Sequence, residues 1–303
     1  IGMDFFDKAL SFGGAGVHVF ILCSGFGLYF SHLRKPLTYV SFLKRRFVKV
    51  YLPYFFVVLL SAILPFYWMS DDKLMSLLSH VFMFKMFFEK YECSFGGQMW
   101  FVSTIIQFYL CWPLIVALFE KLYRESSKYP LFAGCAVSLV WATIVAALGK
   151  SEIRVWNSFF LQYLWEFILG MYLAKMYSLD NQSLCIPSVL KLSVVSVVCL
   201  SICGYAGMSG GILKMYNDAP SLLAFLGISL IIYKLKFINA FFIFTNKFSY
   251  EWYLVHILVF ACSAYVLSLI GVNNKSLTLT LEFVTSYALG YLCGKILFVL
   301  KLK

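Results

Sequence analysis

The sequence predicts an all-α protein, a polytopic bundle of transmembrane helices. Of its 303 residues, 62% are hydrophobic and only 13% are charged, about half of the roughly 25% charged residues of a soluble domain. Much of the chain consists of apolar runs of about 20 residues, the length that a helix needs to cross a hydrocarbon core of about 30 Å. The runs are too long and too uniform for the strands of a barrel, so helices are the expected spanning form.

Nine apolar runs have the length of a span. They are 12–31, 50–68, 98–119, 130–149, 155–174, 188–206, 215–233, 250–271 and 277–300. The segment 74–88 is apolar but shorter, and it contains His80 and Lys85. We expect it to form a short re-entrant or interfacial helix. No repeat and no Pro/Gly/Ser-rich linker divides the sequence, so residues 1–303 are predicted to form a single membrane domain.

The basic residues orient this bundle. The formal net charge is +11, which in a soluble protein would suggest nucleic acid. Here the positive charges lie between apolar runs, and the loop after the first run is the richest in them: Arg34, Lys35, Lys44, Arg45, Arg46 and Lys49. The positive-inside rule makes this loop cytoplasmic. With 74–88 outside, the protein is predicted to be a multi-pass membrane protein with a cytoplasmic C-terminus.

An odd number of spans places the start of the chain outside the cytoplasm, although residues 1–11 do not resemble a signal peptide. We therefore expect one further transmembrane helix upstream of Ile1.

Neither the cysteines nor the glycines predict a metal or phosphate site. Most of the nine cysteines lie inside apolar runs, without CxxC or Cys/His spacing, as small apolar packing residues do. The glycines of 13–16 and 24–27 lack the strand-to-helix context of a phosphate loop. Close packing between helices explains them better.

Ionisable residues inside spans are costly and are candidates for function. His18, Glu166 and His256 lie well inside their runs. Each histidine is either a general base, because imidazole titrates near neutral pH, or a hydrogen-bonded structural residue. Glu166 is equally open between a functional and a structural pairing role. Lys191, Glu282 and Lys295 lie near span ends, where snorkelling explains them.

A basic cluster lies at the start of the second run. Arg45, Arg46 and Lys49 are close in sequence, and Arg46 and Lys49 share a helix face at i, i+3. Such a cluster suits a phosphate-bearing ligand, because arginine forks onto phosphate oxygens. A topology anchor that binds anionic lipid is the alternative, and charge alone favours the anchor.

Five segments together resemble a known family. They are GGAGVHVFILCSGFGLYFS (13–31), SFLKRRFVKVYLPYF (41–55), QMWFVSTIIQFYLCWPL (98–114), FILGMYLAK (167–175) and KFSYEWYLVHIL (247–258). In this order they resemble the motifs of the acyltransferase-three family, bacterial membrane enzymes that O-acylate surface polysaccharides and lipids. The resemblance covers most of the chain.

The resemblance implies transfer of an acyl group, usually acetyl, from cytoplasmic acetyl-CoA to a hydroxyl of an extracytoplasmic sugar or glycolipid. It also implies the bacterial inner membrane as the location, and no metal is expected. The basic cluster then faces the donor, which reverses the preference for a lipid anchor. His256 matches the family's histidine in its tenth helix. The matched motifs also contain Ser24, Gly25, Trp100 and Tyr253.

The chain departs from the family's pattern at several positions. His18 stands where the signature has aspartate, and Lys49 stands where it has arginine. Ile105 and Ile106 replace two glutamates of one subgroup. The family's proposed catalytic histidine belongs to a first helix, and we expect it upstream of Ile1, in the helix that orientation also requires.

Two other classes of function stay open at this point. In a transporter or flippase-like protein for lipid-linked sugar, Glu166 and His256 would line a pathway, but the two halves show none of the symmetry typical of transporters. A non-catalytic relative is the other class. Trp68, Tyr91 and Trp100 suit stacking on an acceptor sugar or an interfacial aromatic belt equally well.

Overall fold

The structure, a computed structural model, describes residues 14, 16–64, 72–92, 94, 96–180, 186–271 and 274–299. Within these ranges the regular structure is entirely helical. The chain divides into two compact units. Unit 1 comprises Ile1–Tyr39 and Thr104–Asn239, and unit 2 comprises Val40–Ser103 and Ala240–Lys303. Helices α6 (Trp100–Leu110) and α14 (Lys236–Thr245) continue from one unit into the other.

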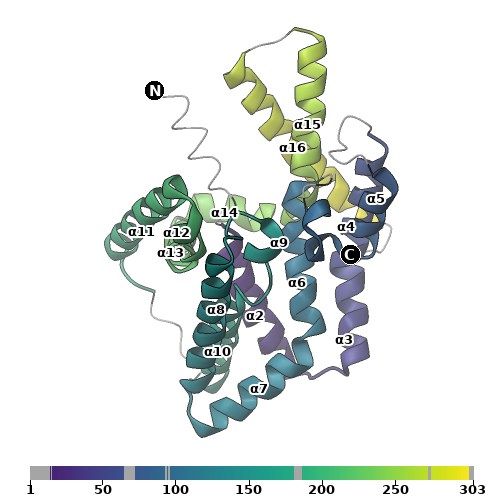
Figure 1. Cartoon of the computed structure of the whole chain (residues 1–303). Coiled ribbons are helices and arrows are strands. Elements are labelled where there is room, and N and C mark those ends of the chain that lie inside the picture. The colour runs from purple at the N-terminus through teal and green to yellow at the C-terminus, as the bar shows by residue number, and fades with distance from the viewer. Residues whose placement is uncertain are drawn as a thin grey trace. The chain divides into compact units, whose positions relative to one another are not determined.

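Unit 1 is built around a pair of packed helices. Its elements are α2 (Val17–Arg34), α7 (Trp112–Glu125), α8 (Tyr129–Ala147), α9 (Arg154–Asn157), α10 (Leu164–Asp180), α11 (Val189–Ser209), α12 (Gly211–Met215) and α13 (Asp218–Lys234). Helix α10 packs against α2 and α8, and α11 packs against α13 (Figure 1). The core of this unit therefore lies along α10, between α2 and α8.

Two glycines bring α2 and α10 into backbone contact. A Cβ on Gly25 would overlap the carbonyl oxygen of Phe167, and a Cβ on Gly170 would overlap that of Leu22. Only glycine has no Cβ, so only glycine permits this approach. The packing role expected for Gly25 is therefore confirmed.

Unit 2 contains a helical hairpin and several short helices. Its elements are α3 (Tyr39–Arg46), the π-helix η2 (Phe47–Tyr51), α4 (Leu52–Ala62), α5 (Lys73–Val81), the 3₁₀ turns η4 (Lys85–Phe87), η5 (Glu89–Tyr91) and η6 (Gly97–Met99), α15 (Ser249–Leu269) and α16 (Lys275–Val299). Helices α15 and α16 lie side by side (Figure 1), and Gly290 leaves room there for Trp252.

The helices support a membrane protein with fewer clear spans than the sequence predicts. Among the described residues, four helices are long and apolar enough to cross a membrane: Tyr129–Ala147, Val189–Ser209, Ser249–Leu269 and Ser276–Val299. Two bent helix pairs raise this number to six at most. The count of nine is thus not confirmed. The run 50–68 yields the eleven-residue α4, and 155–174 is interrupted by turns before α10 begins.

The segment 74–88 contains the short helix α5 of nine residues, followed by η4. Nine helical residues are too few to cross a bilayer. His80 is buried and bonded on both ring nitrogens, to the Tyr54 hydroxyl at 3.0 Å and the Ser94 hydroxyl at 2.9 Å. The bond to Tyr54 attaches the segment to α4, and the bond to Ser94 attaches it to the stretch before η6. Trp68, a candidate for stacking on an acceptor sugar, lies outside the described residues.

Candidate functional site

Three ionisable side chains meet inside unit 1. Nδ1 of His18 lies 2.7 Å from Oε1 of Glu166, and Nε2 of the same ring lies 3.8 Å from Oδ1 of Asp218. His18 is 8% exposed and Glu166 is fully buried. The imidazole thus lies between two carboxyl groups, hydrogen-bonded to one and within ion-pair distance of the other.

Each of these side chains belongs to the first turn of a helix. His18 is the second residue of α2, Glu166 lies in the first turn of α10, and Asp218 begins α13. The N-terminus of a helix carries partial positive charge, which favours carboxylates there and disfavours a cation. The helix dipoles therefore favour a neutral imidazole, and they offset part of the cost of burying a charged carboxyl group.

Gln162 fixes the third member of the group. Its Nε2 donates to Oδ2 of Asp218 at 2.5 Å and to the carbonyl oxygen of Met215 at 2.9 Å. The ring of Tyr163 lies against the imidazole of His18, with centroids 5.6 Å apart. Oδ1 of Asp218 is left to face His18.

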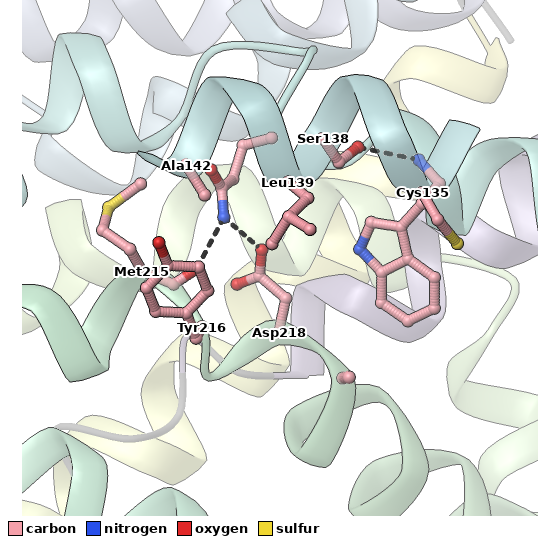
Figure 2. A pocket seen from close by; sticks show the side chains of 10 residues that line it. Cys135, Ser138, Leu139, Ala142, Met215, Tyr216 and Asp218 are labelled. Carbon is pink, nitrogen blue, oxygen red and sulfur yellow. Dashed lines mark hydrogen bonds between the residues drawn. The ribbon is translucent and has the colours of Figure 1, made fainter. Parts of the chain in front are cut away.

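Asp218 also lines an open pocket of about 290 Å³. The pocket is lined by Cys135, Ser138, Leu139, Ala142, Gln162, Trp165, Met215, Tyr216, Asp218 and Ala219. Figure 2 shows Asp218 facing the side of the pocket formed by α8, with its amide hydrogen bond drawn as a dashed line. Another dashed line joins the Trp165 backbone N–H to the Ser138 hydroxyl, 3.1 Å away. The pocket therefore connects the surface of unit 1 with the carboxyl group beside His18.

This arrangement suits general acid–base chemistry. A neutral imidazole that donates Nδ1–H to Glu166 presents Nε2 as an acceptor, on the side where Asp218 lies. When Nε2 takes a proton, the imidazolium gains a charge-assisted hydrogen bond to Glu166. Neither these three side chains nor any other group of at least three His, Cys, Asp or Glu in the described part of the chain is placed to hold a metal ion.

The sequence singles out His18 and Glu166 separately, and the structure brings them together. It does not single out Asp218 or Gln162. Asp218 directly follows Tyr216 and Asn217 at the polar start of an apolar run, where an acid looks like an ordinary helix-terminal residue. The signal that could have found Asp218 is shared with Glu166: an acid in the first helical turn of an apolar segment.

Ser24 and Gly25 lie on α2, together with His18. Gly25 faces the α10 backbone, as described above. Ser24 directly precedes Gly25 and is half-buried. Neither residue belongs to the group of three ionisable side chains.

The second predicted histidine belongs to unit 2. His256 donates from Nδ1 to the carbonyl oxygen of Tyr253, 2.6 Å away and one turn earlier in α15. The Tyr253 hydroxyl donates to the backbone carbonyl oxygen of Gln98. The side-chain Nε2 of Gln98 in turn donates to the Leu254 carbonyl oxygen at 3.2 Å. The buried Trp100 lies just after this junction. These bonds attach α15 to the start of α6 and fix one ring nitrogen of His256 as a donor.

The basic cluster also belongs to unit 2. Arg45 and Arg46 end α3, and Lys49 lies in the π-helix that follows. Arg45 and Lys49 are exposed. The guanidinium of Arg46 lies 5.6 Å from the centre of the Phe42 ring. A π-helix is rare and often accompanies a functional site, and the sequence does not predict it.

Comparison with known proteins agrees with this fold. The model of the acyltransferase-three family, described as an acyltransferase domain, matches residues 2–299. No curated protein matches the chain, and no solved structure matches it.

Proposed function

Because the chain belongs to the acyltransferase-three family, we propose that it is a membrane O-acyltransferase. The acyl group, expected to be acetyl, moves from cytoplasmic acetyl-CoA to a hydroxyl of an extracytoplasmic sugar or glycolipid. The observation that carries the proposal to particular residues is the 2.7 Å hydrogen bond between His18 and Glu166 beside the pocket.

In the proposed reaction His18 acts as the general base. Its Nε2 takes the proton of the acceptor hydroxyl as that oxygen attacks the thioester carbonyl carbon. The new C–O bond forms and the C–S bond breaks, so CoA leaves as a thiolate. The imidazolium then returns its proton, and the products are the O-acyl acceptor and CoA with its thiol restored.

The two carboxyl groups have different roles in this proposal. Glu166, which is bonded to Nδ1, holds the ring in the tautomer that presents Nε2, and stabilises the imidazolium. Asp218, which is 3.8 Å from Nε2 and lines the pocket, is placed to accept a hydrogen bond from the acceptor. Glu166 is thus a positioning residue.

Binding of the donor is assigned to the basic cluster. The phosphates of CoA require several cationic donors, and Arg45, Arg46 and Lys49 supply three in one short stretch of unit 2. The exposure of Arg45 and Lys49 supports a role toward a soluble ligand. His256 stays a second candidate base, with Nδ1 already occupied as a donor.

The experiment that tests the function follows label from acetyl-CoA in membranes that contain the protein and its acceptor lipids. We expect transfer to a glycan or glycolipid fraction. His18→Ala should abolish it, whereas His32→Ala, a histidine near the other end of α2, should keep it. If the His18→Ala variant keeps full transfer and the His256→Ala variant loses transfer, the general base is His256 on α15 and not His18.

The donor site is tested on the same membranes. Arg46→Ala should weaken CoA affinity, and Lys128→Ala, which removes another exposed cation, should not. Unchanged CoA affinity in Arg46→Ala would refute the donor role of the cluster. If membranes with the wild-type protein transfer no label, the non-catalytic class is favoured. Protein-dependent movement of lipid-linked sugar without acylation would favour the transporter.

A further inference from the structure

The pocket beside Asp218 contains a carboxyl group and no positive charge. At about 290 Å³ it is at the small end of the range for ligand pockets. None of the described residues that line it is lysine, arginine or histidine, and Asp218 is the one carboxylic acid among them. Lys214, which precedes the lining residue Met215, is paired with Glu152 at 2.5 Å. A ligand in this pocket therefore meets no cation of the lining.

The amide and hydroxyl donors of the lining are committed to partners within the protein. The Gln162 amide uses both of its hydrogens, one for Oδ2 of Asp218 and one for the carbonyl oxygen of Met215. The Ser138 hydroxyl donates its one hydrogen to the Leu161 carbonyl oxygen at 2.7 Å. Gln162 and Ser138 therefore have no hydrogen left to donate to a ligand.

The hydroxyl of Tyr216 is committed in the same way, through its neighbour Thr143. The two hydroxyl oxygens are 3.2 Å apart, and either geometry of donation is open to them. The Thr143 hydroxyl, however, already donates its one hydrogen to the Leu139 carbonyl oxygen at 2.8 Å. Tyr216 must therefore donate to Thr143, which leaves only lone pairs of the Tyr216 oxygen for a ligand.

One strong acceptor and one donor of the lining stay open to a ligand. Oδ1 of Asp218 has only the long contact of 3.8 Å with Nε2 of His18. The indole N–H of Trp165 has no acceptor among the described residues, and the thiol of Cys135 is a weak donor. The hydroxyl groups of a neutral sugar match this pair, because each of them can both donate and accept.

An anionic ligand finds no such match. A carboxylate or phosphate that leaves water needs a cation or several strong donors to offset its lost hydration. The lining offers one neutral indole N–H, and an ionised Asp218 would repel the anion. The positive end of the α13 dipole does not change this, because Asp218 lies in the first turn of α13 and already occupies that position. Hydrogen bonding and charge therefore both disfavour an anion here.

We propose that this pocket takes an uncharged sugar residue and rejects an acidic one. As a statement about the acceptor of acyl transfer, the proposal rests on the proposed function. One hydroxyl of the neutral residue donates to Oδ1 of Asp218, and another accepts from the indole N–H of Trp165. A uronic acid or a sugar phosphate would place its charge in a lining that holds no cation.

The test measures occupancy of the pocket by protection of Cys135 and does not depend on acyl transfer. Cys135 has an exposed thiol and lies across the pocket from Tyr216 (Figure 2). The full chain in detergent is alkylated with N-ethylmaleimide, and the rate at each cysteine is read by peptide mass spectrometry. Cys23 is the reference, because it is exposed but does not line the pocket.

The ligands are two pairs of sugars that differ only in charge. Methyl glucoside and methyl galactoside should slow the alkylation of Cys135 and leave that of Cys23 unchanged. The corresponding methyl glucuronide and methyl galacturonide carry a carboxylate in place of the hydroxymethyl group. We expect each acid to bind at least about tenfold more weakly than its neutral partner.

A cation placed in the lining should remove this selection. Tyr216 is 42% exposed, so Tyr216→Lys adds a positive charge without burying it. The two acidic sugars should then protect Cys135 about as well as the neutral ones. Tyr216→Gln is the matched control, because it loses the same hydrogen bond to Thr143 but adds no charge, and it should still reject the acidic sugars.

Three outcomes would contradict the proposal. Equal protection by neutral and acidic sugars in the wild type would overturn the charge selection, and protection by none of the four would overturn the sugar site. Unchanged rejection of the acids by Tyr216→Lys would show that the missing cation is not the cause. The proposed function fails separately: if protection follows charge as expected but membranes transfer no label from acetyl-CoA, the pocket binds neutral sugars without being an acceptor site.

Discussion

Glu166→Gln tests whether the buried carboxylate supports the charge that His18 acquires. The substitution keeps the size of the side chain and leaves an oxygen that can accept the Nδ1–H bond, which is 2.7 Å long. Only the charge is removed. Because Glu166 is fully buried, water cannot replace the lost carboxylate.

The size of the effect follows from the strength of the bond. A hydrogen bond to a charged group contributes about 1.5–3 kcal/mol, and a neutral one about 0.5–1.5 kcal/mol. The difference is therefore about 1–1.5 kcal/mol on the imidazolium state, which corresponds to a fall in kcat of about tenfold. Glu166→Ala removes the whole bond and should lower kcat by roughly 10–150-fold. KM for acetyl-CoA should stay unchanged in both variants.

The assay is the initial rate of labelled acetyl transfer in membranes, normalised to protein amount. Glu120→Gln is the matched control, because Glu120 is also bonded within unit 1, to Lys175 at 3.2 Å, but does not contact His18. We expect the control to retain kcat. If Glu166→Gln matches the wild type while His18→Ala is inactive, the carboxylate does not support the imidazolium and our reasoning is wrong.

Three further substitutions probe unit 1. Gly25→Ala should separate α2 from α10, lower stability by about 1–3 kcal/mol and abolish transfer, measured by thermal unfolding and by label transfer. Ser138→Ala removes a hydroxyl that accepts from the backbone N–H of Trp165, and leaving that group unpaired should cost about 1–3 kcal/mol. Glu152, in a loop between predicted spans, has its pKa held below the usual range by the hydrogen bond from Lys214. The stability that this exposed pair contributes is present above the usual carboxyl pKa and is lost as pH falls through the depressed pKa. It amounts to at most about 1 kcal/mol. The Glu152→Gln variant should therefore differ from wild type in unfolding temperature at neutral pH but not in acid.

Each of the three has a control on the same unit. Gly27→Ala adds a Cβ that meets nothing within 4 Å, so equal damage from both glycine variants would argue against the backbone contact. Ser201→Ala removes an exposed hydroxyl bonded only within α11, and should be harmless where Ser138→Ala is not. A difference between Glu152→Gln and wild type that persists unchanged in acid would contradict the assigned cause.

The membrane class and the helical fold follow from the sequence because apolar runs leave no other spanning structure. The number of spans does not follow, because hydropathy averages over a run and does not register a local break. The run 155–174 reads as one span, but the backbone turns between Ser158 and Tyr163 before α10 begins.

The sequence predicts two residues of the candidate site, but it does not predict how their side chains are arranged. His18 and Glu166 are costly inside a membrane, and this cost marks each of them. Their pairing depends on helix contacts between residues 148 positions apart, which one sequence does not encode in any local pattern. The sequence does not identify Asp218 as a candidate, because acidic residues are common at the start of a helix. The π-helix that carries Lys49 has no sequence signature distinct from an α-helix.

The glycine contact between α2 and α10 also limits how this protein can move. Since the two backbones touch at Gly25 and Gly170, a tilt or slide of one helix against the other would push closely packed backbone atoms together. The close contact therefore resists any change in the distance between His18 on one helix and Glu166 on the other. Asp218 belongs to α13, which also packs against α2, and the amide of Gln162 holds its carboxyl group.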